Sequence, residues 1–282
     1  MNIESAIIKG TEILTKYFIP LPYLDSEILM TKAINKDKKY LLINSNKKIN
    51  EKDLNYFKKL IKERSKGKPI AYIINKKYFW NSEFLVSRDT LIPRPDTEIV
   101  VESALNLTKN KTNLNILDIG VGTGCILLSV LKERKSYRGT GIDISKNCLK
   151  LTKINAINLN VAAQIKLYKT NIDKFTLGKY DLILSNPPYI ESKKIKYLDK
   201  DVASFEPKMA LDGGIDGLSE ISKVIKKSSE LIKNGGKLIL EIAYNQKQEV
   251  KKLLKVNGFY INSVVKDLGK NDRCIISTKI ED

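Results

Sequence analysis

The chain of 282 residues is 42% hydrophobic and 29% charged, a balance typical of a globular protein with enough apolar residues for a buried core. Histidine is absent, which excludes Ser-His-Asp and Cys-His mechanisms and histidine metal sites. The three cysteines form no Cys-x-x-Cys pair, so we expect no metal, no disulfide framework and a reducing, cytoplasmic compartment.

The hydrophobic runs of the sequence are short. None reaches the roughly 18 apolar residues of a transmembrane helix, so we expect no membrane association. Residues Met1–Tyr17 carry charged side chains at regular intervals, which predicts an amphipathic helix rather than a signal peptide.

The net charge of +18 has two interpretations. Of the 50 basic residues, 44 are lysine, many beside Asn and Ile, which is the bias that an AT-rich genome produces. A polyanionic partner such as nucleic acid is the other interpretation. Arginine, the better reader of base edges, occurs only six times, which weakens sequence-specific nucleic-acid recognition.

Residues 1–75 predict a small helical bundle without strands. Ile3, Ile7 and Leu14 recur at helical spacing, and apolar residues of Asp53–Lys66 do the same. Gly67-Lys68-Pro69 ends the last of these helices. We treat 1–75 as a first domain.

Residues 76–96 predict a β-hairpin linker. Two β-rich runs, Tyr78-Phe79-Trp80 and Phe84-Leu85-Val86, flank the polar turn Asn81-Ser82-Glu83. Pro93 and Pro95 end the hairpin, and the domain boundary is expected there.

Residues 97–282 predict a second domain of the α/β class. Apolar strand segments alternate with helical segments, which indicates a mainly parallel sheet covered on both faces. No helix separates the last two strands, so these should pair antiparallel. The predicted strands are Asn115–Ile119, Thr140–Ile144, Gln164–Tyr168, Tyr180–Ser185, Lys237–Ile242, Asn262–Val265 and Cys274–Ser277.

A glycine-rich loop follows the first strand of this domain. Its residues are Gly120-Val121-Gly122-Thr123-Gly124, and glycines at a strand-to-helix turn let the backbone approach a ligand closely. The third glycine comes one residue earlier than in the dinucleotide fingerprint, and no Lys-Ser/Thr follows as in a P-loop. The loop therefore suits the amino-acid end of a cofactor without pyrophosphate, and the preceding Asp118 is placed to meet an ammonium group.

Asp143 ends the second predicted strand, 19 positions beyond Gly124. A carboxylate at the tip of the neighbouring strand can accept hydrogen bonds from both hydroxyls of a ribose. A plain turn with a helix-capping Asp is the alternative. Together with the glycine loop, Asp143 favours a nucleoside cofactor.

The fourth predicted strand ends in Asn186-Pro187-Pro188-Tyr189. Ligands of open α/β sheets lie outside the carboxyl ends of the strands, so this corner should face the reactive end of the cofactor. The two prolines fix the backbone and have no N–H donors, so only their carbonyl acceptors remain. The side-chain carbonyl of Asn186 is a further acceptor. A rigid turn after a core strand is the alternative interpretation.

This corner suits a planar NH₂ group. Asn186 Oδ1 and the Pro187 carbonyl would each accept one hydrogen, and Tyr189 would pack against the conjugated plane. The nitrogen lone pair is then directed at an electrophile, so positioning and electrostatic stabilisation carry the catalysis without a strong base.

These motifs resemble the S-adenosylmethionine-dependent methyltransferases that modify amide or exocyclic nitrogens. Within them, the chain resembles the peptide chain release factor glutamine methyltransferases (the PrmC/HemK family), and the resemblance covers essentially its whole length. Related ribosomal-protein glutamine methyltransferases usually carry Arg-Ser-Pro where this chain has Arg94-Pro95-Asp96, which favours release factors. The segments that carry the resemblance are Leu91–Glu98, Phe205–Pro207, Ala210–Gly214, Asp216–Leu218, Gly235–Gly236, Leu240–Ile242, Gln246, Asp267–Gly269 and Asp272–Arg273.

The resemblance implies a Rossmann-like, seven-stranded class I methyltransferase domain. It implies that S-adenosylmethionine is bound by Gly120, Val121, Gly122, Thr123, Gly124, Asp143 and Asn186. It also implies that Asn186, Pro187, Pro188 and Tyr189 bind the glutamine amide of the Gly-Gly-Gln loop of class 1 release factors, which the N-terminal domain would grip elsewhere.

Near the adenine, this chain departs from the family. Where an aromatic residue is usual, it has Thr170-Asn171-Ile172-Asp173, so Asn171 is expected to bond the adenine amine and Ile172 to pack on its ring. Arg94 and Glu98 either orient the loop near the methyl donor or are a surface arginine and a helix N-terminal charge.

The sequence thus predicts a cytoplasmic, monomeric methyltransferase whose partner is a class 1 release factor and whose cofactor product is S-adenosylhomocysteine. No metal and no nucleic acid are required. One alternative is an adenine-N6 or guanine-N2 nucleic-acid methyltransferase, and another is a ribosomal-protein glutamine methyltransferase. A third is a non-catalytic binding module that keeps the fold.

Overall fold

The computed structural model describes residues 1–280, which form two compact units. The first comprises Met1–Lys76 together with Asp199–Phe205, and the second comprises Lys77–Leu198 together with the chain from Glu206 onward. Within residues 1–280, no helix is long and apolar enough to cross a membrane.

The first unit is helical, as its apolar spacing predicts. Asn2 caps its first helix by accepting a hydrogen bond from the Ser5 backbone N–H at 2.8 Å. Gly10 lets the first two helices approach closely, because a Cβ at this position would lie 2.5 Å from Ser26 Oγ. A buried ion pair joins Arg64 to Asp25 at 2.6 Å. The helices are α1 (Ile3–Lys16), α2 (Pro22–Ile34), α3 (Lys38–Ile43), α4 (Glu51–Ser65), α5 (Ile70–Ile74) and α9 (Lys200–Phe205).

A two-stranded sheet, β1 (Lys76–Phe79) and β2 (Ser82–Leu85), occupies the predicted hairpin. Phe79 and Phe84 are fully buried and meet edge to face with their ring centroids 6.1 Å apart. Both rings belong to a hydrophobic cluster of the second unit, so the hairpin packs as part of that unit's core.

The second unit contains, within residues 1–280, a seven-stranded sheet in the order β5-β4-β3-β6-β7-β9-β8. The strands from β5 to β7 are parallel, while β9 pairs antiparallel with both β7 and β8 as predicted for the last two strands. The strands are β3 (Asn115–Ile119), β4 (Arg138–Asp143), β5 (Ile165–Lys169), β6 (Tyr180–Ser185), β7 (Ile232–Glu241), β8 (Phe259–Lys266) and β9 (Asp272–Lys279).

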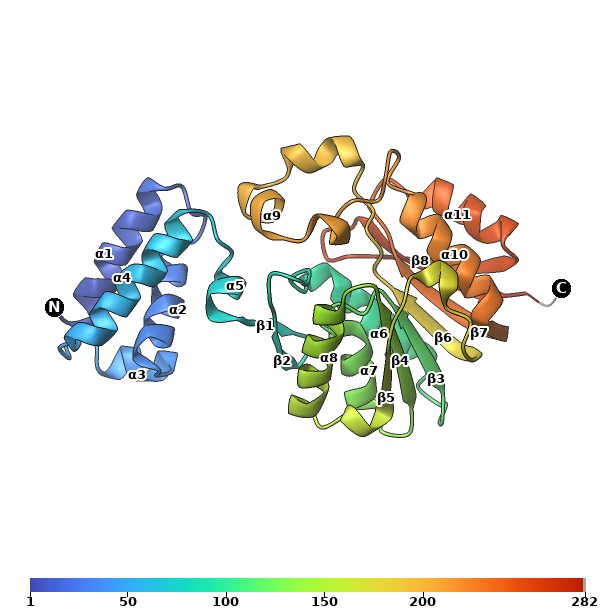
Figure 1. The fold of residues 1–282 in the computed structure, drawn as a ribbon, viewed down its shortest axis with the longest axis horizontal. Helices are drawn as coiled ribbons and strands as arrows, with labels where there is room; N and C mark the ends of the chain where they lie inside the picture. The colour runs from blue at the N-terminus through green and yellow to red at the C-terminus, as the bar shows by residue number, and fades with distance from the viewer. Residues whose placement is uncertain (281–282) are drawn as a thin grey trace. The chain divides into compact units, whose positions relative to one another are not determined.

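Helices cover both faces of this sheet (Figure 1). Successive strand residues point to opposite faces, so Ile116 and Leu182 join one buried cluster while Leu117 and Ile183 join the other. The first cluster includes side chains of α6, α7 and α8, and the second includes those of α10 and α11. The helices are α6 (Glu98–Leu107), α7 (Cys125–Glu133), α8 (Lys146–Asn158), α10 (Ser219–Leu231) and α11 (Lys247–Val256).

The strand order creates a switch point beside β3. The chain leaves β3 toward β4 and β5 on one side and returns to β6 on the other, so the connections diverge at the carboxyl ends of β3 and β6. Such a point opens a crevice in open α/β sheets. Short 3₁₀ turns line the connections, at Pro95–Thr97, Ala162–Gln164, Ile172–Lys174, Ser192–Tyr197 and Lys208–Ala210.

Candidate active site

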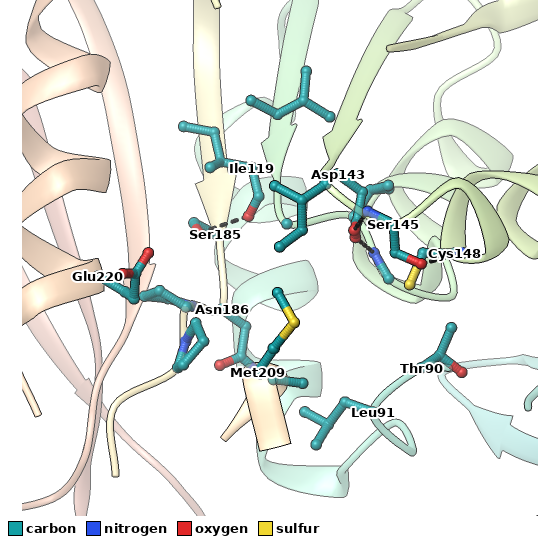
Figure 2. A pocket seen from close by; sticks show the side chains of 18 of the residues that line it. Thr90, Leu91, Ile119, Asp143, Ser145, Cys148, Ser185, Asn186, Met209 and Glu220 are labelled. Atoms are coloured by element: carbon teal, nitrogen blue, oxygen red, sulfur yellow. Dashed lines mark hydrogen bonds between the residues drawn. The ribbon is translucent and has the colours of Figure 1, made fainter. Parts of the chain in front are cut away.

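A cavity of about 760 Å³ lies at this switch point. It is lined by Gly120–Thr123 after β3, Asp143–Ser145 after β4, Thr170–Ile172 after β5 and Asn186–Pro188 after β6. Figure 2 shows Asp143 and Asn186 on separate sides of it. The structure therefore brings together the two motifs that the sequence singled out.

The glycine loop depends on glycine for two different reasons. Gly120, Gly122 and Gly124 have φ angles of +79°, +56° and +82°, a region that side chains disfavour. A Cβ at Gly120 would meet no atom within 4 Å, whereas one at Gly124 would lie 2.8 Å from Leu128 and Thr152 side-chain carbons. Gly120 thus keeps the backbone open to the cavity, and Gly124, which does not line it, serves the packing of α7.

Asp143 holds the loop as well as facing the cavity. Its Oδ2 accepts a hydrogen bond from the Gly122 backbone N–H at 3.0 Å, and its Oδ1 accepts one from Ser145 N–H at 2.8 Å. Burial raises the pKa of this carboxyl, and the bonds from Ser145 and Gly122 lower it. Each oxygen keeps a second lone pair, so Asp143 can still accept from a ligand.

Asp118 does not face the cavity. It is 1% exposed, and burial raises its pKa to about 7, while a hydrogen bond from the Leu127 backbone opposes that rise. Its Oδ1 has no hydrogen-bond partner among residues 1–280. The prediction that Asp118 meets an ammonium group is not supported, because its carboxyl points into the protein toward the start of α7.

Asn171 and Ile172 both line the cavity after β5. Asn171 Oδ1 accepts a hydrogen bond from the Asp173 backbone N–H at 3.0 Å and so caps the short turn Ile172–Lys174. Ile172 packs against the hydrophobic cluster on the α10 and α11 face. An amide and an aliphatic side chain are thus presented side by side.

Asn186 has a fixed side chain at the β6 end of the cavity. Its Nδ2 donates to Thr97 Oγ1 at 3.1 Å, which leaves Oδ1 as the acceptor on the other side of the amide. Thr97 is 2% exposed and closes the cavity behind Asn186. The acceptor required for an NH₂ group is therefore present.

Pro187 and Pro188 line the cavity, but Tyr189 does not. The Tyr189 hydroxyl instead donates to Glu241 Oε1 at 3.4 Å, and burial raises the pKa of this phenol. Glu241 is 1% exposed, and burial raises its pKa to about 7. The structure thus places Tyr189 behind the proline corner, with its hydroxyl turned to a buried acid.

A second layer holds the backbone of this corner. Gln246 Nε2 donates to the carbonyls of Tyr189 at 3.1 Å and Gly217 at 3.0 Å. A Cβ at Gly213 would lie 2.8 Å from Tyr189 Cα and 2.9 Å from the Pro188 carbonyl oxygen. The segment after β6 is therefore fixed by close backbone packing as well as by its prolines.

Arg94 and Glu98 have separate roles. Arg94 lines the cavity and forms an ion pair with Glu206, which also accepts from the Ile92 backbone N–H at 3.2 Å. Glu98 does not line the cavity, and its Oε1 accepts from the Trp80 backbone N–H at 2.7 Å. Glu98 therefore anchors the hairpin rather than the methyl donor site.

Comparison with known proteins identifies the family. Over 284 residues, the chain is 38% identical to the release factor glutamine methyltransferase of Buchnera aphidicola subsp. Acyrthosiphon pisum, and the match covers 100% of both chains. It is 40% identical over 276 residues to the protein of the same name from Fusobacterium nucleatum subsp. nucleatum, covering 96% of this chain and 77% of the relative. The chain belongs to the release factor glutamine methyltransferase family.

Two family descriptions match separate parts of this methyltransferase. "PrmC N-terminal domain" matches residues 5–74, and "Methyltransferase small domain" matches residues 97–202. A ribosomal protein L11 methylase from Lactobacillus delbrueckii subsp. bulgaricus shares the fold with a TM-score of 0.50 at 19% identity, covering 67% of this chain and 81% of its own. The family and the Rossmann-like class I methyltransferase fold predicted from the sequence are confirmed.

Several side chains of this methyltransferase site were not identified as such from the sequence. Thr97, Glu241 and Gln246 meet the Asn186–Tyr189 corner from segments far away in the chain. Signals were available, because Leu91–Glu98, Leu240–Ile242 and Gln246 are among the segments that carry the family resemblance. For Glu241 there was also a physical signal, since an acid that ends an otherwise apolar strand must find polar partners once it is buried. Within residues 1–280, no group of three or more Cys, Asp or Glu side chains is arranged to hold a metal ion.

Proposed function

We propose that this protein methylates the side-chain amide nitrogen of the glutamine in the Gly-Gly-Gln motif of class 1 peptide chain release factors, with S-adenosylmethionine as methyl donor. The observation that carries this proposal is the oriented Asn186 amide, whose free oxygen lies in the same cavity as the glycine loop and Asp143. Membership of the release factor glutamine methyltransferase family supports the same substrate.

The cavity fits S-adenosylmethionine. The open backbone at Gly120 and Gly122 accepts close approach, since a Cβ at either position would meet no atom nearer than 3.9 Å. Asp143 offers lone pairs for ribose hydroxyls, while Asn171 and Ile172 offer an amide and an aliphatic face for adenine. When bound, the cofactor supplies an electrophilic methyl group and leaves as S-adenosylhomocysteine.

The chain's own residues position the acceptor nitrogen. Asn186 Oδ1 and the Pro187 carbonyl accept the two amide hydrogens of the substrate glutamine, which turns the nitrogen lone pair toward the methyl donor. The preorganised acceptors lower the barrier because they need no rearrangement during the reaction. An amide nitrogen that has received a methyl group is strongly acidic, so a chain without histidine can complete the reaction without a strong base.

Tyr189 has a supporting part in this proposal. With its hydroxyl turned to Glu241 and its backbone carbonyl held by Gln246, it fixes the end of the Asn186–Tyr189 corner. The flat contact with the substrate amide that the sequence predicts requires its ring rather than its hydroxyl, and Tyr189→Phe separates the two roles.

The wider setting is also a proposal. We expect the helical unit of residues 1–75 to contact the release factor, the enzyme to act as a monomer in the cytoplasm, and nucleic acid to be unnecessary for turnover. The basic net charge of +18 is the observation that favours a nucleic-acid methyltransferase as the second candidate.

A methyl-transfer assay distinguishes the two. Radiolabelled S-adenosylmethionine is offered with purified class 1 release factor, with its Gln→Ala variant in the Gly-Gly-Gln loop, and with bulk DNA and RNA. Label on the intact release factor but not on the variant supports substrate and position together. Label on nucleic acid alone overturns the release-factor proposal and keeps the shared amine-positioning chemistry.

A further inference from the structure

Helix α8 carries a stripe of buried polar side chains. Cys148, Thr152 and Asn155 stand at positions i, i+4 and i+7, which places them on one face of the helix. Their exposed fractions are 5%, 0% and 1%. A polar side chain is costly to bury unless it is hydrogen-bonded, so the partners of this stripe show what it holds.

Two of these side chains hold the backbone of the glycine loop. Thr152 Oγ1 donates to the Gly122 carbonyl at 2.9 Å, and Asn155 Nδ2 donates to the Thr123 carbonyl at 2.9 Å. Gly122 and Thr123 both line the cavity. The stripe therefore fixes the part of the loop that the proposed cofactor would approach.

The same stripe also holds the segment that follows the hairpin. Asn155 Oδ1 accepts from the Leu85 backbone N–H at 2.8 Å, and Asn155 Nδ2 donates to the Leu85 carbonyl at 3.1 Å. Cys148 Sγ donates to the Asp89 carbonyl at 3.1 Å. The chain continues directly into Thr90 and Leu91, which line the cavity (Figure 2). Helix α8 thus joins two walls of one cavity.

The orientation of the Asn155 amide is fixed by these partners. Nδ2 donates to two carbonyl oxygens, and Oδ1 accepts from an N–H. The reversed amide would place its oxygen against two carbonyls and its NH₂ group against an N–H. One amide plane therefore joins Leu85 to Thr123, and neither can leave Asn155 without the loss of a buried hydrogen bond.

We propose that Asn155 is a positioning residue that couples the glycine loop to the segment after the hairpin, so that cofactor binding at the loop orders residues 85–91. The cofactor in this inference is the S-adenosylmethionine of the proposed function. A ligand seated on the loop opposes any motion that displaces the Thr123 carbonyl, and the Leu85 bonds share the same amide. By linkage, loss of these bonds must weaken cofactor binding.

Hydrogen exchange of the wild-type enzyme, followed by NMR with and without S-adenosylhomocysteine, tests the coupling directly. The Leu85 N–H reports on the link, because Asn155 accepts from it. The Trp80 N–H of the same hairpin is the control, since it donates at 2.7 Å to Glu98, which does not line the cavity. Saturating ligand should slow exchange at Leu85 at least about 10-fold more than at Trp80. Equal slowing of the two amides would mean general stabilisation of the fold and overturns the proposal.

Asn155→Ala removes the link, and Thr152→Val is its matched control. Thr152→Val keeps the shape of a buried α8 side chain and removes the bond to the Gly122 carbonyl, so it disturbs the loop without touching Leu85. It should weaken S-adenosylhomocysteine binding by about 3- to 10-fold and keep the selective protection of Leu85. In Asn155→Ala the affinity should fall at least about 10-fold, and Leu85 and Trp80 should respond to the ligand within about 2-fold of each other. Selective protection of Leu85 in folded Asn155→Ala contradicts the role assigned to Asn155.

Calorimetry with S-adenosylhomocysteine separates the two ways in which this test can fail. If the wild-type enzyme does not bind the ligand, the cofactor of the proposed function is refuted and the coupling falls with it. Binding with equal protection of the two amides overturns the coupling alone. Circular dichroism verifies that each variant is folded, and if Asn155→Ala does not fold, the wild-type exchange measurement still decides because it needs no variant.

Discussion

The two halves of the active site are stabilised in different ways. The loop Gly120–Gly124 is held by side chains of β4 and α8, which lie 21 to 32 positions further along the chain: Asp143 and Thr152 bond to Gly122, and Asn155 bonds to Thr123. Its shape also depends on glycine. The corner Asn186–Tyr189 is held by side chains from three other segments, Thr97, Glu241 and Gln246. The proposed cofactor loop is thus held by the two elements β4 and α8 that follow it, whereas the proposed substrate corner is held by segments 52 to 89 positions away in the chain.

The largest effect is expected from removing the Asn186 side-chain oxygen, the acceptor in the proposed substrate corner. Asn186→Ala should lower kcat by about 100- to 1,000-fold, because it deletes a preorganised acceptor in the reacting site. The affinity for S-adenosylmethionine should stay within about 2-fold in calorimetry, since the glycine loop is untouched. Asn158→Ala, at an exposed position of α8, is the control for a lost asparagine. Wild-type turnover in Asn186→Ala contradicts the amide-positioning mechanism.

The buried acid behind the corner predicts a pH-dependent stability. Burial raises the pKa of Glu241 from 4.5 to about 7, so between these values the folded protein binds more protons than the unfolded chain. Stability should therefore fall as the pH rises from 4.5 to 7, by up to about 3 kcal/mol from this group. Asp118 acts in the same direction, since burial raises its pKa from 3.8 to about 7.

Urea unfolding of the wild type and of Glu241→Gln at pH 5 and pH 8 measures this effect. Between pH 5 and pH 8, Glu241→Gln should lose less stability than the wild type. A double variant that also carries Asp118→Asn should lose still less. Glu102→Gln, at an exposed position of α6, should keep the wild-type slope. If the free energy of unfolding changes by the same amount between pH 5 and pH 8 in the wild type and in Glu241→Gln, this acid is not buried in its neutral form.

The same contrast explains how much could be predicted from the sequence. The glycine loop and Asp143 were identified because adjacent residues carry the pattern, and β3 and β6 have the predicted bounds. The contacts of the proline corner were not, although Thr97 lies in a segment that carries the family resemblance, because Asn186 and Thr97 are separated by 89 positions and no local pattern marks them as a pair. Tertiary packing alone brings them together.

The predicted start of one strand was wrong. The β7 strand begins at Ile232, five residues before the predicted start at Lys237, because Tyr180 pairs with Ile232 across an irregularity that includes Gly235 and Gly236. A pair of glycines predicts a turn, but here the two glycines lie within the strand as an irregularity of its pairing. The contact of Asp118 with an ammonium group stays a prediction; the structure shows that the alternation of β3 buries this side chain and that Asp118 does not line the cavity.

A moderate effect is expected from Gln246, which holds the backbone of the Asn186–Tyr189 corner. Gln246→Leu removes the hydrogen bonds to the Tyr189 and Gly217 carbonyls and leaves both buried oxygens unsatisfied, which should cost about 1–3 kcal/mol of stability. It should also lower kcat by about 10-fold through displacement of the corner. Gln248→Leu, two residues away at an exposed position of α11, should change neither quantity. A kcat that survives in folded Gln246→Leu would show that the prolines alone fix the corner.

The glycine loop is tested with two glycines that have similar left-handed backbone conformations. Gly120 and Gly235 have φ angles of +79° and +72°, and a Cβ at either would meet no atom within 4 Å. Alanine at each position should therefore cost a similar amount of stability, about 1–2 kcal/mol, from the left-handed conformation. Only Gly120→Ala places its methyl group at the cavity, so only this variant should also weaken S-adenosylmethionine binding. Equal cofactor affinity in the two variants would mean that the glycine at 120 serves the turn and not the approach of the ligand.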